Sequence, residues 1–332
     1  MSRKVCLTGI KPTGTPHIGN YFGAIKPAIE LAENYDSRYF IADYHAINTV
    51  KDPKLLKEMT TKLAATWLAC GLNPETMMFY RQSDVPETFE LTTILMAFTA
   101  KGLMNRAHAY KAKVQDNSEE GKEPDSGINM GLFTYPVLMA ADILLFDTNI
   151  VPVGKDQKQH VEIAADVAQS LNHTYGKELL VVPNPVISET TQVIVGLDGR
   201  KMSKSYDNVI PLFLPSKKFR KVIMKIVTNS QELEEPKDPD ASHVFSLYKL
   251  FATEQEQQAA RERYLAGGMG WGHAKQELYE IMEARFAPLR EKYDMYMKDP
   301  EQIDKILKEG AEKARTIASA TVNRLRAAIG ID

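Results

Sequence analysis

The sequence has 332 residues, 44% of them hydrophobic, which is enough to bury the core of one large or two ordinary domains. Its 41 basic and 43 acidic side chains nearly cancel, which excludes binding of DNA or RNA through net charge alone and requires local basic patches for any polyanion. No segment approaches a membrane-spanning helix, and the start MSRKVCLTGI lacks the apolar core of a signal peptide, so we expect a globular, cytoplasmic protein with no membrane partner.

Four short apolar segments predict β-strands, at 4–9, 38–43, 77–82 and 149–154, and a longer helical pattern follows each of them. This alternation is typical of a parallel sheet covered by helices, so the predicted fold class is α/β with a Rossmann-type sheet domain. Cys6 lies in the first strand and Cys70 in a helical segment, far away in sequence. We therefore expect two core residues, and neither a disulfide, a zinc site nor an iron–sulfur cluster.

Between the third and fourth strands we expect an apolar helix over 90–105 and a polar, mobile loop over 115–127. Beyond Pro211 the strands stop, and helices are predicted at 217–227, 243–252, 274–297 and 301–329, with a flexible turn at 267–272. The predicted division is a sheet domain over 1–212 with a helical insertion at about 85–145, a smaller helical domain over 213–300, and a C-terminal helix over 301–332 that packs back toward the sheet domain.

The first predicted strand is followed by IKPTGTPHIGNYFGA, a glycine-rich loop that leads into a helix. In parallel α/β sheets the ligand binds at this kind of position, where slim backbone lets a phosphate approach amide groups. His17 and Asn20 stand at the start of the helix, and an imidazole is able to donate to a phosphate. The same stretch is also compatible with a plain glycine-rich turn capped by a histidine. It matches neither the GxGxxG fingerprint nor the P-loop.

The segment GRKMSKS, residues 199–205, contains two lysines three positions apart and no apolar face. On a flexible loop near a nucleotide, Lys201 and Lys204 would stabilise the charge that builds on phosphates as a bond breaks. Two lysines fit a pyrophosphate leaving group.

PHIGN and KMSKS together resemble the paired signatures of the class I aminoacyl-tRNA synthetases, and GNYFGA resembles their tryptophanyl branch, in which Asn20 is usual. The likeness extends over nearly the whole chain, including GAEKAR at 310–315. The resemblance implies activation of L-tryptophan with ATP to tryptophanyl-adenylate and pyrophosphate, followed by transfer to the 2′-hydroxyl of the terminal adenosine of tRNA(Trp). The tyrosyl enzymes, which share the architecture, are the alternative.

TYPVLMAADILL, residues 134–145, predicts an apolar helix with a single carboxylate, Asp142. A buried carboxylate is costly unless it accepts a hydrogen bond, and an indole N–H is a suitable donor. By resemblance Asp142 receives that N–H while Met139 and Ile143 pack on the ring, and Met139 favours indole over phenol because many tyrosyl enzymes have Gln there. Without the flanking motifs, a core helix with a satisfied Asp142 is the other interpretation. By the same resemblance the tryptophan pocket also contains His45, Tyr135 and Gln157.

The resemblance makes His17, Lys201 and Lys204 the catalytic groups, with Mg²⁺ that arrives with ATP and is not fixed by the protein. It assigns ATP binding to Lys11, Gly19, Asn20, Lys113, Gly154, Asp156, Ile194, Met202 and Ser203. Lys11 departs from the Gln that the family often has there. A solvated surface lysine is the other interpretation of Lys113. A metal site formed by Asp156 and His160 lacks a third ligand.

The resemblance also implies a homodimer and makes 213–300 the tRNA anticodon-binding domain. The basic run SKKFRKVIMK is either a tRNA contact or a solvated helix face. The apolar segment Leu91 to Met104 is the expected dimer interface. Two other classes stay open, a small-molecule nucleotidyltransferase and a non-catalytic tRNA-binding paralogue; the second is expected to lack the motif lysines or His17, and all three are present.

Overall fold

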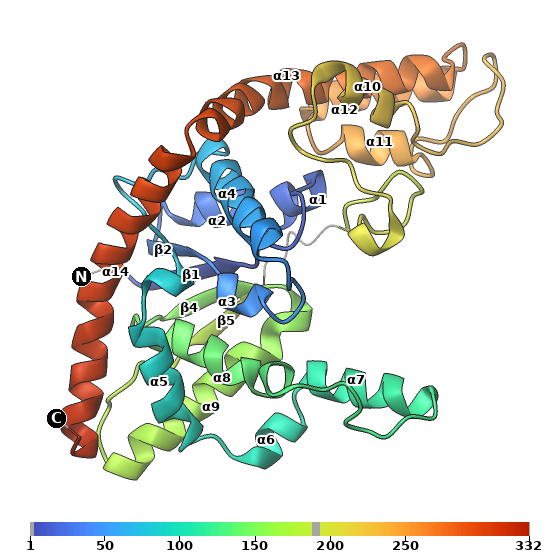
Figure 1. The fold of residues 1–332 in the computed structure, drawn as a ribbon. Coiled ribbons are helices and arrows are strands. Elements are labelled where there is room, and N and C mark those ends of the chain that lie inside the picture. The colour runs from blue at the N-terminus through green and yellow to red at the C-terminus, as the bar shows by residue number, and fades with distance from the viewer. Residues whose placement is uncertain (1–2, 188–192, 332) are drawn as a thin grey trace.

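The computed structural model describes residues 3–187 and 193–331, and its centre is a five-stranded parallel sheet (Figure 1). The strand order is β3-β2-β1-β4-β5. The strands are β1 (Val5–Ile10), β2 (Asp36–Ile41), β3 (Met78–Arg81), β4 (Ile150–Val153) and β5 (Asn184–Ile187). The predicted α/β class is confirmed: a Rossmann-like sheet is surrounded by helices and followed by a helical C-terminal region.

The fifth strand was absent from the prediction, which placed only four. The segment NPVI contains Pro185 and is alternately exposed and half-buried, so it lacks the continuous apolar run of a buried strand. It lies at the edge of the sheet and is paired with β4, and a missing N–H is tolerated at such an edge.

The helices of the sheet region are α1 (Ile18–Asn20), α2 (Lys26–Leu31), α3 (Asp43–Ala46), α4 (Pro53–Ala69), α5 (Glu87–Met96), α6 (Lys101–Asn105), α7 (His108–Glu119), α8 (Met130–Leu144) and α9 (Lys158–Tyr175). Those that follow are α10 (Ser216–Ile223), α11 (His243–Tyr248), α12 (Glu254–Ala266), α13 (Trp271–Lys298) and α14 (Pro300–Ile329).

Helices cover both faces of the sheet because alternate strand residues point to opposite sides. Phe40 packs with the buried side chains of α5, α8 and α9, whereas its neighbours Tyr39 and Ile41 pack with those of α4. The strand order reverses between β1 and β4. From β1 the sheet continues to β2 and β3, and from β4 it continues in the opposite direction to β5. In such sheets the crevice at the carboxyl ends of these two strands is the place for a ligand.

The helical C-terminal region shares its core with the first loop of the chain. Phe219 of α10, Phe245 of α11 and Met282 of α13 belong to one buried cluster with Ile18 and Met202. The loop after β1 and the segment KMSKS are therefore packed against the base of this region.

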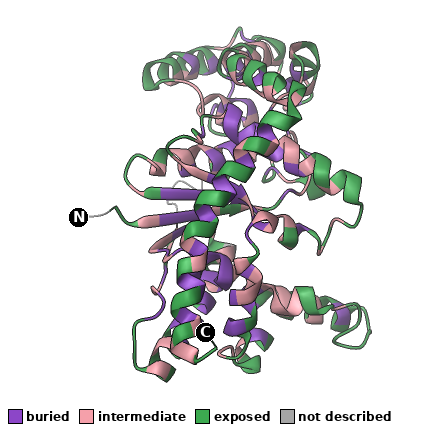
Figure 2. Ribbon diagram, turned by 60° about the vertical axis from the view of Figure 1, so that its left-hand side comes forward, coloured by how far each residue is buried: buried purple, intermediate pink, exposed green. Residues whose placement is uncertain are grey.

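Helices α13 and α14 form a long arc along one side of the molecule (Figure 1). α14 lies beside the edge strand β3 and α5, and its outward side is exposed along its length (Figure 2). It buries Ile303 and Leu307 in one core cluster and Ala314 and Leu325 in another, so it closes the sheet edge with apolar contacts.

Several helical predictions need correction. The single helix expected over 90–105 is two helices, α5 and α6, which are separated by residues 97–100. Residues 115–119, expected in a loop, continue α7, and buried Asn117 donates from Nδ2 to the carbonyls of Pro124 and Ser126 in the turn that follows. α12 was not predicted, because eight of its thirteen residues are polar or charged; its signal was the capping box of Thr253 and Glu256. The turn predicted over 267–272 ends at Gly270, since Trp271 begins α13.

The apolar segment Leu91 to Met104 was expected at a dimer interface. Its side chains Leu91, Leu95 and Met104 are buried within one chain, in the cluster with α8 and α9, and Met96 is the large apolar residue that stays exposed. The dimer stays a prediction. Across the described ranges, 3–187 and 193–331, no helix is long and apolar enough to cross a membrane.

Candidate active site

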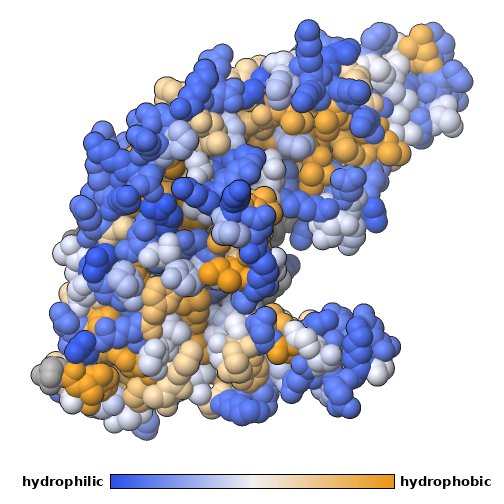
Figure 3. All heavy atoms as spheres, viewed as in Figure 1, coloured by the Kyte–Doolittle hydropathy of each residue, from blue (hydrophilic) through white to orange (hydrophobic). Residues whose placement is uncertain are grey.

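The loop after β1 and the segment KMSKS are joined by backbone hydrogen bonds. Ile18 N–H donates to the Ile210 carbonyl at 3.0 Å, and Leu212 N–H donates to the Pro16 carbonyl at 3.1 Å. The histidine motif PHIGN and the lysine motif KMSKS are far apart in sequence. These hydrogen bonds bring them together beyond the carboxyl end of β1. The surface is hollowed on this face between the helical region and α7 (Figure 3).

His17 is buried at 7% exposure, and its Nδ1 has no partner among the residues that the structure describes. Burial, with a smaller contribution from the Lys204 ammonium, lowers the pKa of His17 to about 4. The ring rests on Gly19, where a Cβ would lie 3.0 Å from it, so only glycine fits this contact without displacement. His17 is thus a neutral imidazole with one ring nitrogen free for a ligand.

Lys204 reaches across to the first loop, where its Nζ donates to the Thr13 carbonyl. Its partial burial lowers its pKa from the ordinary lysine value. Lys201 is exposed. The Met202 side chain is buried, its Sδ accepting from Gly19 N–H at 3.4 Å, and Met202 N–H donates to the Ile194 carbonyl at 2.8 Å. Predicted ATP ligands Gly19, Ile194 and Met202 are therefore brought together.

A residue that the sequence analysis missed, Asn208, organises the KMSKS segment. Its buried amide accepts from the N–H of Ser203 at 2.8 Å and donates to Asp198 Oδ1 at 2.7 Å and to the Lys201 carbonyl at 3.1 Å. These three bonds hold the hairpin that carries both lysines. An asparagine beside the motif gave no sequence signal that distinguishes it from a turn residue.

A cavity of about 370 Å³ lies between β1, β4 and α8 at the reversal of the strand order. Eight predicted site residues line it: Lys11, Asn20, His45, Tyr135, Met139, Asp142, Ile143 and Gln157. Gly154 lines a neighbouring cavity of about 410 Å³ beside α2. Asp156 falls in the 3₁₀ turn Lys155–Gln157, and its side chain lies outside what the structure describes.

Lys113 does not line this cavity. It lies half-buried on α7, which extends away from the sheet (Figure 1). Its role as an ATP ligand stays a prediction.

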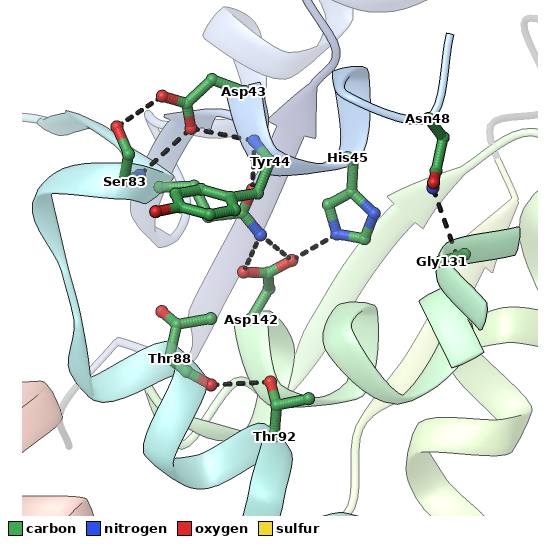
Figure 4. Close-up of polar contacts among 10 residues, drawn as sticks. Asp43, Tyr44, His45, Asn48, Ser83, Thr88, Thr92, Gly131 and Asp142 are labelled. Carbon is green, nitrogen blue, oxygen red and sulfur yellow. Dashed lines mark hydrogen bonds and ion pairs between the residues drawn. The ribbon is translucent and has the colours of Figure 1, made fainter. Parts of the chain in front are cut away.

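Asp142 is 2% exposed and is surrounded by donors. His45 Nε2 lies 2.8 Å from its Oδ2, and Gln82 Nε2 donates to Oδ1 at 2.8 Å and to Oδ2 at 3.0 Å (Figure 4). Burial raises the pKa of Asp142 above its ordinary value, while the hydrogen bonds from His45 and Gln82 act in the opposite direction. The carboxylate is therefore a paired acceptor at the wall of the cavity, and it retains capacity for one more donor.

His160 also organises the site without having been assigned to it. It is 2% exposed, and its ring bonds to the Tyr135 hydroxyl and approaches Gln157 Oε1 at 3.0 Å. It thus orients two predicted tryptophan ligands. Within the described part of the chain, no group of three His, Cys, Asp or Glu side chains could hold a metal.

Comparison with known proteins shows the family of the chain. Residues 2–287 match the family described as tRNA synthetases class I (W and Y). The chain is 55% identical to the tryptophan–tRNA ligase of Bordetella parapertussis over 98% of its own length and 72% of that protein, and 52% identical to that of Neisseria meningitidis over 100% and 99%. A crystal structure of tryptophanyl-tRNA synthetase from Campylobacter jejuni, complexed with ADP and tryptophan, is 46% identical, with a TM-score of 0.91 over 98% of this chain and 99% of that one.

Proposed function

The chain belongs to the W and Y family of the class I tRNA synthetases, and we propose that the site described above carries out its tryptophan–tRNA ligase reaction. The observation that carries this assignment is the buried carboxylate of Asp142 at the wall of the 370 Å³ cavity, with Met139 beside it. An indole N–H completes the acceptor capacity of Asp142, and a thioether packs on the ring without demanding a polar partner.

The amino acid lies with its indole against Met139 and Ile143 and its ammonium toward Tyr135 and Gln157. Both of these side chains carry oxygens, and His160 orients them. His45 closes the same cavity beside Asp142. The carboxylate end of the substrate then points to the first loop, where Lys11 and Asn20 line the cavity.

Adenylation requires no side-chain nucleophile. A carboxylate oxygen of tryptophan forms a bond to the α-phosphorus of ATP, the bond from that phosphorus to the bridging oxygen breaks, and pyrophosphate leaves. The 2′-hydroxyl of the terminal adenosine of tRNA(Trp) then attacks the acyl carbon, loses its proton, and releases AMP. The protein contributes positioning and charge stabilisation.

The nucleotide binds across Gly19, Asn20 and Met202, with Ile194 and Met202 beside the adenine and Gly154, Asp156 and Ser203 around the ribose and phosphates. Neutral His17 donates to a phosphate through a ring N–H. Lys201 and Lys204 stabilise the charge that develops on the leaving pyrophosphate. Mg²⁺ enters as part of the ATP substrate.

The helical region 213–300 is the anticodon-binding domain in this proposal, and the enzyme acts as a cytoplasmic homodimer with tRNA. Basic side chains on and just after α10 support the tRNA contact, since Lys217, Lys218, Arg220, Lys221 and Lys225 are all exposed.

The test is amino-acid-dependent ATP–pyrophosphate exchange by the purified protein, with tryptophan and tyrosine in parallel. We expect exchange with tryptophan, and a loss of about 10- to 100-fold in kcat/KM for Asp142→Asn, because an uncharged amide that presents N–H to the indole replaces a charged acceptor. Exchange with tyrosine alone would overturn the pocket assignment while leaving the lysine loop intact. Unchanged exchange by Asp142→Asn would remove Asp142 from the role given to it.

A further inference from the structure

Gln82 is a fully buried side chain behind the amino-acid cavity. It is the first residue after β3 and is 0% exposed. It does not line the cavity, yet its amide nitrogen donates to both oxygens of Asp142, at 2.8 and 3.0 Å. Gln82 therefore reaches the pocket only through that carboxylate.

The orientation of the Gln82 amide is determined by the backbone of another element. Its Oε1 accepts from the N–H of Tyr44, in α3, at 3.1 Å. If the amide turned over, its NH₂ would face the Tyr44 N–H and its oxygen would face Asp142, and both contacts would become repulsive. The backbone of α3 thus ensures that Asp142 faces N–H groups and not an oxygen on this side.

The turns that carry Gln82 and Tyr44 are themselves joined. Ser83 donates to Asp43 through its N–H at 3.1 Å and through its hydroxyl at 2.5 Å (Figure 4). α3 follows β2, and the turn of Gln82 follows β3, so both turns stand at the carboxyl edge of adjacent strands. This second contact holds the same two turns together without touching Asp142, which provides a matched control.

We propose that Gln82 is a positioning residue for substrate selection: it holds Asp142 as an acceptor with one place left for the indole N–H. The inference rests on the proposed function, since it assumes that Asp142 accepts that N–H. A carboxylate held by two bonds from behind keeps one orientation, and an analogue without N–H leaves its remaining acceptor site unpaired. Gln82 therefore determines how strongly the pocket rejects such an analogue.

The experiment compares tryptophan with an isosteric analogue that has sulfur in place of the indole N–H, benzothienylalanine. Exchange kinetics are measured for the wild type, Gln82→Met, Gln82→Glu and the control Ser83→Ala. In Gln82→Met we expect kcat/KM for tryptophan to fall roughly tenfold, mainly through KM, while the value for the analogue changes little, because a bond of this kind to a charged group corresponds to about that factor. The preference for tryptophan over the analogue then falls by the same factor.

Gln82→Glu has the same shape and places a carboxyl group against Asp142, so its loss of preference is expected to be at least as large. It also provides the test if Gln82→Met does not fold, with thermal unfolding as the check on both. Ser83→Ala is expected to keep the wild-type preference. If kcat/KM falls equally for tryptophan and the analogue in the Gln82 variants, or falls for neither, the preference is unchanged and the proposal is overturned. If the wild type itself fails to activate tryptophan, the proposed function has failed, which is a separate outcome.

Discussion

At the scale of single residues, the site depends on two buried groups, the neutral imidazole of His17 and the carboxylate of Asp142, whose protonation states are set by their surroundings. His17 is buried beside a lysine and has a pKa of about 4, so it stays neutral at the pH of a cell. Asp142 is buried among donors, which offset the cost of burying its charge. Each of these states depends on one or two identifiable contacts.

The depressed pKa of His17 predicts a pH dependence of stability. Between the unfolded value near 6.5 and the folded value of about 4, the unfolded chain binds more protons, so stability falls as the pH decreases through this window. We expect His17→Gln to remove roughly 1–3 kcal/mol of that decrease in the free energy of unfolding. Denaturant unfolding at pH 7.5 and pH 4.5 measures it. If the free energy of unfolding changes equally between the two pH values in the wild type and in His17→Gln, His17 does not titrate in this way.

The position of Lys204 predicts a separation of kinetic parameters. Lys204 contacts the first loop but does not line the amino-acid cavity, so Lys204→Met should lower kcat in exchange by about 10²–10³ with little effect on KM for tryptophan. Arg200→Met is the control. Arg200 is another cation of the same hairpin, and its guanidinium pairs with Asp198. A similar loss in both variants would mean that only the charge of the hairpin matters.

At the scale of elements, α14 approaches β3 so closely that only glycine fits. A Cβ on Gly310 would lie 1.8 Å from the carbonyl oxygen of Phe79, which is backbone and cannot move aside cheaply. The contact lets the last helix cover the edge of the sheet, where unpaired backbone groups would otherwise favour aggregation.

Gly310→Ala is therefore expected to destabilise the protein by about 3 kcal/mol or more, through displacement of α14 from the sheet edge. The measurement is the midpoint of thermal or denaturant unfolding. Gly272→Ala in α13 is the control, since nothing lies within 4 Å of the added Cβ, and it should be neutral or slightly stabilising. Equal stability of the two variants would contradict the close contact.

At the scale of the whole molecule, the near-zero net charge means that any tRNA contact depends on local patches. The exposed lysines belong to α10 in the helical region, which lies apart from β1, β4 and α8, the elements around the amino-acid cavity (Figure 1). Activation of tryptophan and recognition of tRNA should therefore be separable by mutation.

Replacing Lys217, Lys218 and Lys221 by Glu is expected to raise KM for tRNA about tenfold or more in aminoacylation and to leave tRNA-independent exchange unchanged. The salt dependence of aminoacylation should become shallower, because fewer phosphates are neutralised. The matching triple replacement of Lys305, Lys308 and Lys313 on α14 is the control. If this control weakens aminoacylation equally, the effect comes from total charge and not from α10.

The sequence by itself determined the α/β class, the helical C-terminal region and the two motifs PHIGN and KMSKS, because each of these is written in contiguous residues. Alternation of apolar strands and helices is a local pattern, and so are PHIGN and KMSKS. The sequence analysis did not predict β5 and α12, because an edge strand and a largely polar helix lack the apolar pattern on which the prediction depends. Eight predicted site residues line the cavity, whereas Gly19, Ile194 and Met202 meet at the KMSKS segment and Lys113 lies on α7.

Only the tertiary structure decided which polar side chains hold the site in place. Gln82 is 60 residues from Asp142, and His45 is 97 residues from it. Their role depends on α8 bringing Asp142 beside the residues that follow β2 and β3, and on the backbone N–H of Tyr44 that orients the amide. Hydrogen bonds are specific over about 3 Å, a distance that the linear order of residues does not encode.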